Sequence, residues 1–76
     1  MSETQLQILL PLVAVLATGT LFTLRELLGD QWDAVAGPSP QHFGADFALA
    51  VKGGLIPNVV FHEIRRTGRA NVWRKL

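Results

Sequence analysis

Cysteine is absent from the 76 residues of this chain, and its absence excludes both disulfide bonds and thiolate metal sites. Charged residues are also scarce, at 17% of the sequence, whereas apolar residues make up 49%. This balance is too apolar for a disordered chain and poor in charge for a soluble surface. A chain this short forms one small unit at most, so any core that it builds alone is modest.

No motif with the spacing of a catalytic or metal-binding site is present either. His62-Glu63 begins an H-E-x-x-H pattern, but Arg66 occupies the position of the second histidine ligand. His42 and His62 are better explained as hydrogen-bonded or solvated side chains than as ligands of a metal or pigment. We therefore expect a chain that is not an enzyme and has no cofactor of its own. Lipids are expected to bind, and pigments or redox centres are expected only in partner subunits.

The most prominent feature that is present is an apolar run from Leu6 to Leu24, without charge from Ile8 onward. Its length matches the roughly 17–25 residues that cross a bilayer core. The acidic leader and the length of the run argue against a cleaved signal peptide. The sequence thus predicts a retained transmembrane helix within residues 1–28, with a modest kink at Pro11.

Small residues within this predicted helix are spaced four apart, which favours the close approach of another transmembrane helix. The helix-docking face predicted on this spacing consists of Ala14, Thr18, Gly19 and Thr23. The alternative is that such residues are simply common in membrane helices, with the threonine hydroxyls bonded to the preceding turn.

After the run, the composition predicts a polar connector at residues 29–39, rich in glycine, proline and aspartate. Two short helices are expected in 40–67, at a membrane surface or packed on a partner. The first is expected over Pro40 to Lys52, because serine and proline favour a helix start and Gly53 a stop. The second is expected near 57–67, and residues 68–76 are predicted to form a basic tail.

An alternative topology places residues 43–61 in the membrane as well, which makes a two-helix transmembrane hairpin. Asp46 and Lys52 oppose this alternative, since each costs roughly 2.5–3.5 kcal/mol at the centre of an inserted helix.

Basic and aromatic residues outside the run are predicted to anchor the chain at the membrane interface and to contact anionic lipid headgroups. These predicted interface anchors are Arg25, Trp32, Arg65, Arg66, Arg69, Trp73, Arg74 and Lys75. Nucleic acid is not expected as a partner, since a lone basic stretch is a weak pattern for it. The excess of basic residues places the C-terminus on the cytoplasmic or matrix-like side of a bacterial or organellar inner membrane.

The fold predicted from the sequence is therefore all-α, with a single transmembrane helix followed by short interfacial helices. These pieces are too few to bury one another, so we expect transmembrane partner subunits. The predicted function is that of a small non-catalytic accessory subunit of a larger membrane complex, such as a respiratory or photosynthetic one. The alternatives are a self-assembling membrane protein such as a phage holin, and a small reversible regulator of a transporter.

Overall fold

A computed structural model describes residues 1–65 and 70–76 of the chain. The described residues form both helices and strands, so the fold is mixed rather than all-α. The helices are α1 (Glu3–Ala14), α2 (Leu24–Leu28), the 3-10 turn η1 (Gly29–Gln31), α3 (Trp32–Ala36) and α4 (Pro40–Lys52). The strands are β1 (Leu21–Phe22), β2 (Val59–Ile64) and β3 (Asn71–Lys75).

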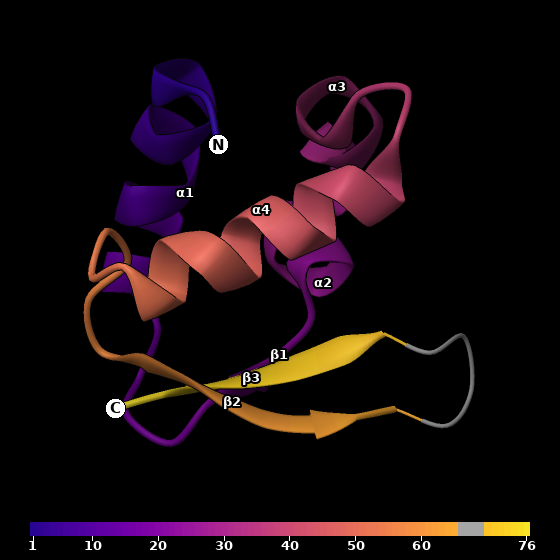
Figure 1. Cartoon of the computed structure of the whole chain (residues 1–76). Coiled ribbons are helices and arrows are strands. Elements are labelled where there is room, and N and C mark those ends of the chain that lie inside the picture. Colours follow the sequence, from indigo (N-terminus) through magenta and orange to yellow (C-terminus); the bar gives the residue numbers. More distant parts are fainter. Residues whose placement is uncertain (66–69) are drawn as a thin grey trace.

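The strands form one antiparallel sheet in the order β1-β3-β2, with the C-terminal strand in the centre. The helices gather over one face of this sheet, as Figure 1 shows. On the opposite face, Leu21 and Arg74 stand side by side in register and are both exposed. The described part of the chain is thus a two-layer structure with helices on one side and a sheet on the other.

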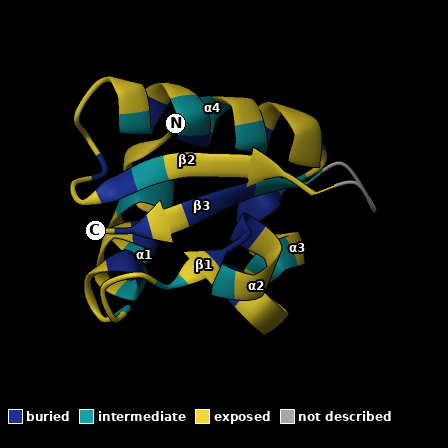
Figure 2. Ribbon diagram, turned by 90° about the horizontal axis from the view of Figure 1, so that it is seen from below, coloured by how far each residue is buried: buried dark blue, intermediate teal, exposed yellow. Residues whose placement is uncertain are grey.

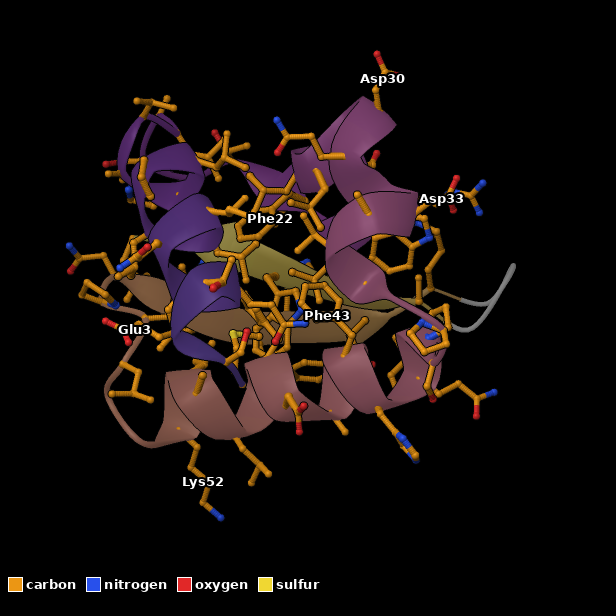
Figure 3. The ribbon with its side chains drawn as sticks, turned by 90° about the horizontal axis from the view of Figure 1, so that it is seen from above. Glu3, Phe22, Asp30, Asp33, Phe43 and Lys52 are labelled. Atoms are coloured by element: carbon orange, nitrogen blue, oxygen red, sulfur yellow. The ribbon has the colours of Figure 1, made fainter. Side chains whose placement is uncertain are left out.

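The core lies between the two layers. Phe47 of α4 and Leu9 of α1 are its largest fully buried side chains. Trp73 reaches the core from the central strand, and its ring lies edge-on to that of Phe47, with 5.0 Å between the centroids. Figure 3 shows Phe22 and Phe43 directed into the same interior, from β1 and α4 respectively.

The apolar run that was predicted to cross a membrane is divided between two elements. Helix α1 ends at Ala14, and the chain then turns and enters β1 at Leu21. Among the described residues, no helix has both the length and the apolar character that crossing a bilayer requires. The predicted transmembrane helix and the single-span all-α fold are therefore wrong. The predicted location in an inner membrane and the predicted side of the C-terminus depended on that helix, and they are contradicted together with it.

The turn within the run has a local cause. Gly19 adopts a φ of 89°, which glycine reaches without a Cβ clash. The Thr20 hydroxyl donates to the Ala17 carbonyl at 2.6 Å, which holds the turn closed. Thr23 then caps a new helix, because its side chain accepts from the Glu26 N–H at 3.1 Å. The apolar side chains on both sides of this turn fill one core instead of facing lipid.

Within the segment near 57–67, which was expected to be a helix, residues Val59–Ile64 form the extended strand β2. β2 is rich in β-branched and aromatic residues, which suit a pleated, half-buried surface. The predicted basic tail contains β3, the central strand of the sheet. Residues 43–61 divide between α4 and β2, so the transmembrane-hairpin alternative is contradicted as well.

Helix α4 spans Pro40–Lys52, the range in which the first short helix was expected. Its buried side chains are Phe43, Phe47 and Ala50, which lie on one face of the helix. Lys52 projects away from the body of the molecule, as Figure 3 shows. The preceding region, expected to be a polar connector, contains η1 and α3, and Figure 3 shows Asp30 and Asp33 on its outer side.

Candidate docking surface

The outer edge of β2 presents main-chain groups that no described strand pairs, because the sheet ends there. The Leu76 N–H donates to the Asn58 carbonyl at 2.8 Å, which fixes where the ladder begins. In an antiparallel pair, residues alternate between bonding the neighbouring strand and facing away from it. Asn58 bonds Leu76, directly after β3, and Val60, two residues later, bonds β3 itself. The N–H and C=O groups of Val59 and Phe61 therefore face away from β3.

Ile64 has the same orientation at the other end of the strand. The Arg65 N–H donates to the Ala70 carbonyl at 2.8 Å, and Ile64 is the next residue, in register with Asn71. Its own N–H and C=O therefore face outward. Within residues 1–65 and 70–76, no other segment bonds these outward groups. We call the outward main-chain groups of Val59, Phe61 and Ile64, together with the side chains of Phe61 and Ile64, the β2 edge.

The β2 edge is also apolar. The side chain of Phe61 is 51% exposed and that of Ile64 is 60% exposed. In Figure 2, seen from the sheet side, most of β2 is coloured as exposed, while much of β3 is buried. The Phe61 ring lies edge-on to the buried Trp73, with 5.7 Å between the centroids. The edge thus offers unpaired hydrogen-bonding groups and apolar contact area at the same positions.

Natural sheet edges are commonly blocked by lysine, proline, bulges or a covering element. β2 contains neither lysine nor proline, and its charged residue is Glu63. A bulge occurs at His62, between the registers of Phe61 and Glu63. The other edge strand, β1, comprises only Leu21–Phe22. β2 is therefore the longer edge of the sheet, and of these blocking features its sequence carries only the bulge.

A cleft of about 490 Å³ lies on the helix side of the sheet, between the start of β3, α2 and the first turns of α4. Trp32 and Trp73 contribute its aromatic surface, and Gln41 and Asn71 contribute side-chain amides. Arg25 is the charged residue among those that line it. The cleft therefore combines a largely apolar wall with one positive charge.

An ion pair joins the end of β2 to α2. The Arg65 guanidinium lies 3.6 Å from the Glu26 carboxylate, and both side chains are about half exposed. Glu26 also accepts a hydrogen bond from the Thr23 N–H at 3.0 Å, which completes a capping box. The hydrogen bonds from Thr23, aided by Arg65, hold the pKa of Glu26 below its ordinary value of about 4.5.

We expect this lowered pKa to make α2 sensitive to acid. Because the folded chain binds the proton of Glu26 less readily than the unfolded chain does, the carboxylate contributes stability above pH about 4.5. That contribution is lost as the pH falls through the lower folded pKa. The urea midpoint of Glu26→Gln should therefore lie below that of the unaltered chain at neutral pH, and the gap should close as the pH falls below about 4.5 and through the folded pKa of Glu26. A gap that stays constant with pH would contradict the assignment.

The residues of the predicted helix-docking face do not share one helix. Ala14 is the last residue of α1, whereas Thr18 and Gly19 lie in the exposed turn that follows. Thr23 is buried and caps α2. The four residues therefore form no common surface for a partner helix.

The predicted interface anchors fall into several environments. Arg25 and Trp32 line the cleft, and Arg74 is exposed on the sheet face away from the helices. Arg66 and Arg69 lie outside the described residues. Trp73 is only 3% exposed and Lys75 only 8%, so neither is available to a membrane surface. Contact of the exposed members with anionic lipid headgroups stays a prediction.

Sequence reasoning missed the β2 edge and the burial of Lys75. The Lys75 ammonium donates to the Val13 carbonyl at 2.6 Å, at the C-terminal end of α1. Nothing local in the sequence indicates this contact, because the two residues are far apart along the chain. The run Val59-Val-Phe carried a strand signal, but periodicity alone does not separate a short buried strand from a helix.

Among the described residues, no group of three or more His, Asp or Glu side chains is placed to hold a metal ion. Comparison with known protein families, with curated proteins and with solved structures finds no match in any of the three.

Proposed function

We propose that this chain is a small non-catalytic subunit that docks onto a partner protein by pairing β2 with an extended, acidic segment of that partner. The observation that carries the proposal is the β2 edge. There the outward main-chain groups of Val59, Phe61 and Ile64 coincide with the exposed side chains of Phe61 and Ile64.

Addition of a strand to an open sheet edge is a recurring mode of peptide recognition. Main-chain hydrogen bonds supply affinity in this mode, and alternate side chains supply specificity. Phe61 and Ile64 project from the same sheet face as Trp73 and Asn71, their partners in register. A segment paired with β2 would therefore lay its own apolar side chains against Phe61 and Ile64, beside the helix layer.

The charge of this region favours an acidic segment. Residues 59–76 carry five of the seven basic side chains of the chain and only one of its six acidic ones. Arg74 is exposed on the central strand, directly across from Val60 in β2. A segment paired with β2 would lie two strands from Arg74, so the attraction would come from the net positive charge of this region and not from a direct cross-strand pair. A second copy of this chain would bring the same excess of positive charge to the edge, so an acidic partner segment complements it better.

The first test uses two synthetic peptides of about eight residues, one alternating valine with glutamate and the other alternating valine with lysine. Binding is followed by NMR hydrogen exchange of the β2 amides. We expect the valine–glutamate peptide to protect the outward amides of Phe61 and Ile64, while the amide of Val60, already bonded to β3, changes little. The affinity of the valine–lysine peptide should be lower by a factor of at least about ten.

A pair of variants at one position separates main-chain pairing from side-chain contact. Ile64→Pro removes an N–H that bonds no described residue, so the ladder to β3 keeps its hydrogen bonds. Ile64→Ala removes the same apolar side chain but keeps the N–H. We expect peptide affinity to be about tenfold lower for Ile64→Pro than for Ile64→Ala.

Equal affinity of these two variants would contradict strand pairing. Equal binding of both peptides would contradict the acidic partner. Protection of the same amides by rising protein concentration alone would show that a second copy of the chain occupies the edge, and would overturn the proposal.

A further inference from the structure

The cleft beside β3 is separate from the outward side of β2 and offers a different kind of surface. Trp73, almost fully buried, contributes to the cleft from the central strand. Its ring is held by edge-on contacts with Phe47 and Phe61, so this part of the cleft is fixed by packing on two sides. Trp32 contributes from α3, and its ring lies edge-on to Phe43 with 5.9 Å between the centroids. The aromatic surface of the cleft is therefore held in place from both layers of the fold.

The cleft is open because α4 presents small residues to it. Gly44 and Ala45 line it, and a Cβ built on Gly44 would meet no atom within 4 Å. The volume of about 490 Å³ lies within the range of about 300–1,000 Å³ that is usual for small-molecule sites. A ligand of two fused rings with a short polar chain matches this space.

The polar groups of the cleft favour a negative charge. Arg25 lines the cleft, and no described carboxylate forms an ion pair with it. None of the lining residues is acidic. The Asn71 and Gln41 side chains add amide groups that can donate hydrogen bonds. A guanidinium with amides around it binds a carboxylate through charge-assisted, often bidentate, hydrogen bonds.

We propose that the cleft binds a small amphipathic carboxylate, with its apolar body against the half-buried Trp32 and over the buried Trp73, and its carboxylate on the Arg25 guanidinium. This site goes beyond the docking of a partner at β2, since its ligand enters between the helix layer and the sheet. The aromatic surface supplies contact area, and Arg25 supplies the preference for an anion.

The probes that test the site are naphthylacetate and its uncharged amide, naphthylacetamide, which differ in the charge that Arg25 would bind. The chain has two tryptophans, and both line the cleft, so their indole N–H signals in NMR report directly on occupancy. We expect naphthylacetate to shift both signals and to bind about tenfold more tightly than the amide.

Three variants locate the site. Arg25→Gln should abolish the preference for the acid over the amide while both still bind weakly. Gly44→Leu should remove binding of both probes, because the leucine side chain fills the cleft. Leucine has a higher helix propensity than glycine, so the substitution should not destabilise α4. Lys52→Gln removes the same charge from an exposed position at the far end of α4 and should leave both affinities unchanged.

Equal affinity for acid and amide in the unaltered chain would overturn the role of Arg25. Binding that survives in the folded Gly44→Leu variant would place the ligand elsewhere. Absence of any shift of the indole signals by millimolar naphthylacetate would overturn the site itself, whatever the peptide tests at the β2 edge show.

Discussion

Trp73→Ala is expected to destabilise the chain by about 3–5 kcal/mol, the range for removing a large buried aromatic side chain. The side chain is 3% exposed and contacts aromatic rings from α4 and β2. Chains of this size have a total stability of about 4–11 kcal/mol, so the loss consumes much of it. Urea unfolding followed by far-UV circular dichroism measures the effect.

Two further variants make this result interpretable. Trp32→Ala removes the same side chain from a half-buried position on α3 and should cost less. Trp73→Phe keeps an aromatic ring in the core, so it should fold even where Trp73→Ala does not. If Trp73→Ala were as stable as the unaltered chain, Trp73 would be an exposed residue, as an interface anchor is, and the position of β3 at the centre of the sheet would be wrong.

Lys75→Met is expected to destabilise the chain by about 1.5–3 kcal/mol, the contribution of a hydrogen bond to a charged group. The Lys75 ammonium bonds the Val13 carbonyl at 2.6 Å, and α1 has no basic residue of its own in its last turn. Lys75 therefore supplies the positive charge that stabilises a helix C-terminus. Methionine keeps the apolar length of the side chain and removes only the ammonium group, so the difference measures that group.

Arg74→Met is the matched control, since it removes a positive charge from the adjacent, exposed position in the same strand. Its effect on the urea midpoint should stay within about 0.5 kcal/mol, as is usual for exposed sites. A Lys75→Met chain as stable as the control would show that the cost of burying the ammonium cancels its bond.

Helix α4 is the element that local sequence signals predicted correctly. Ser39 and Pro40 favour a helix start, Gly53 and Gly54 favour a stop, and the apolar residues between them repeat with helical spacing. These signals act within one segment, and the helix forms over Pro40–Lys52 with Phe43, Phe47 and Ala50 buried. Ser39 makes no side-chain capping hydrogen bond, so the agreement between Pro40 at the start, the glycines at the end and the apolar periodicity is the reason that this element could be predicted.

The apolar run shows the opposite case. Hydropathy measures how much apolar surface a segment must remove from water, but it does not say what covers that surface. In the structure, the run turns back at Gly19, and Leu9, Val13, Phe22 and Leu24 pack against α4 and β3 in one core. The β2 edge and the cleft were equally beyond prediction, because both depend on strand pairing between residues that are distant in sequence.

The sequence by itself determined that the chain has no disulfide or thiolate site, that nearly half of its residues are apolar, and where α4 begins and ends. Only the tertiary structure decided that the apolar run closes a core instead of crossing a bilayer, that the basic C-terminal segment becomes the central strand, and that Trp73 and Lys75 are buried. The physical reason is that capping and periodicity are local. Burial and strand pairing depend on which distant segments come into contact. The free energy gained by packing and pairing these segments outweighs the local conformational preference of each one.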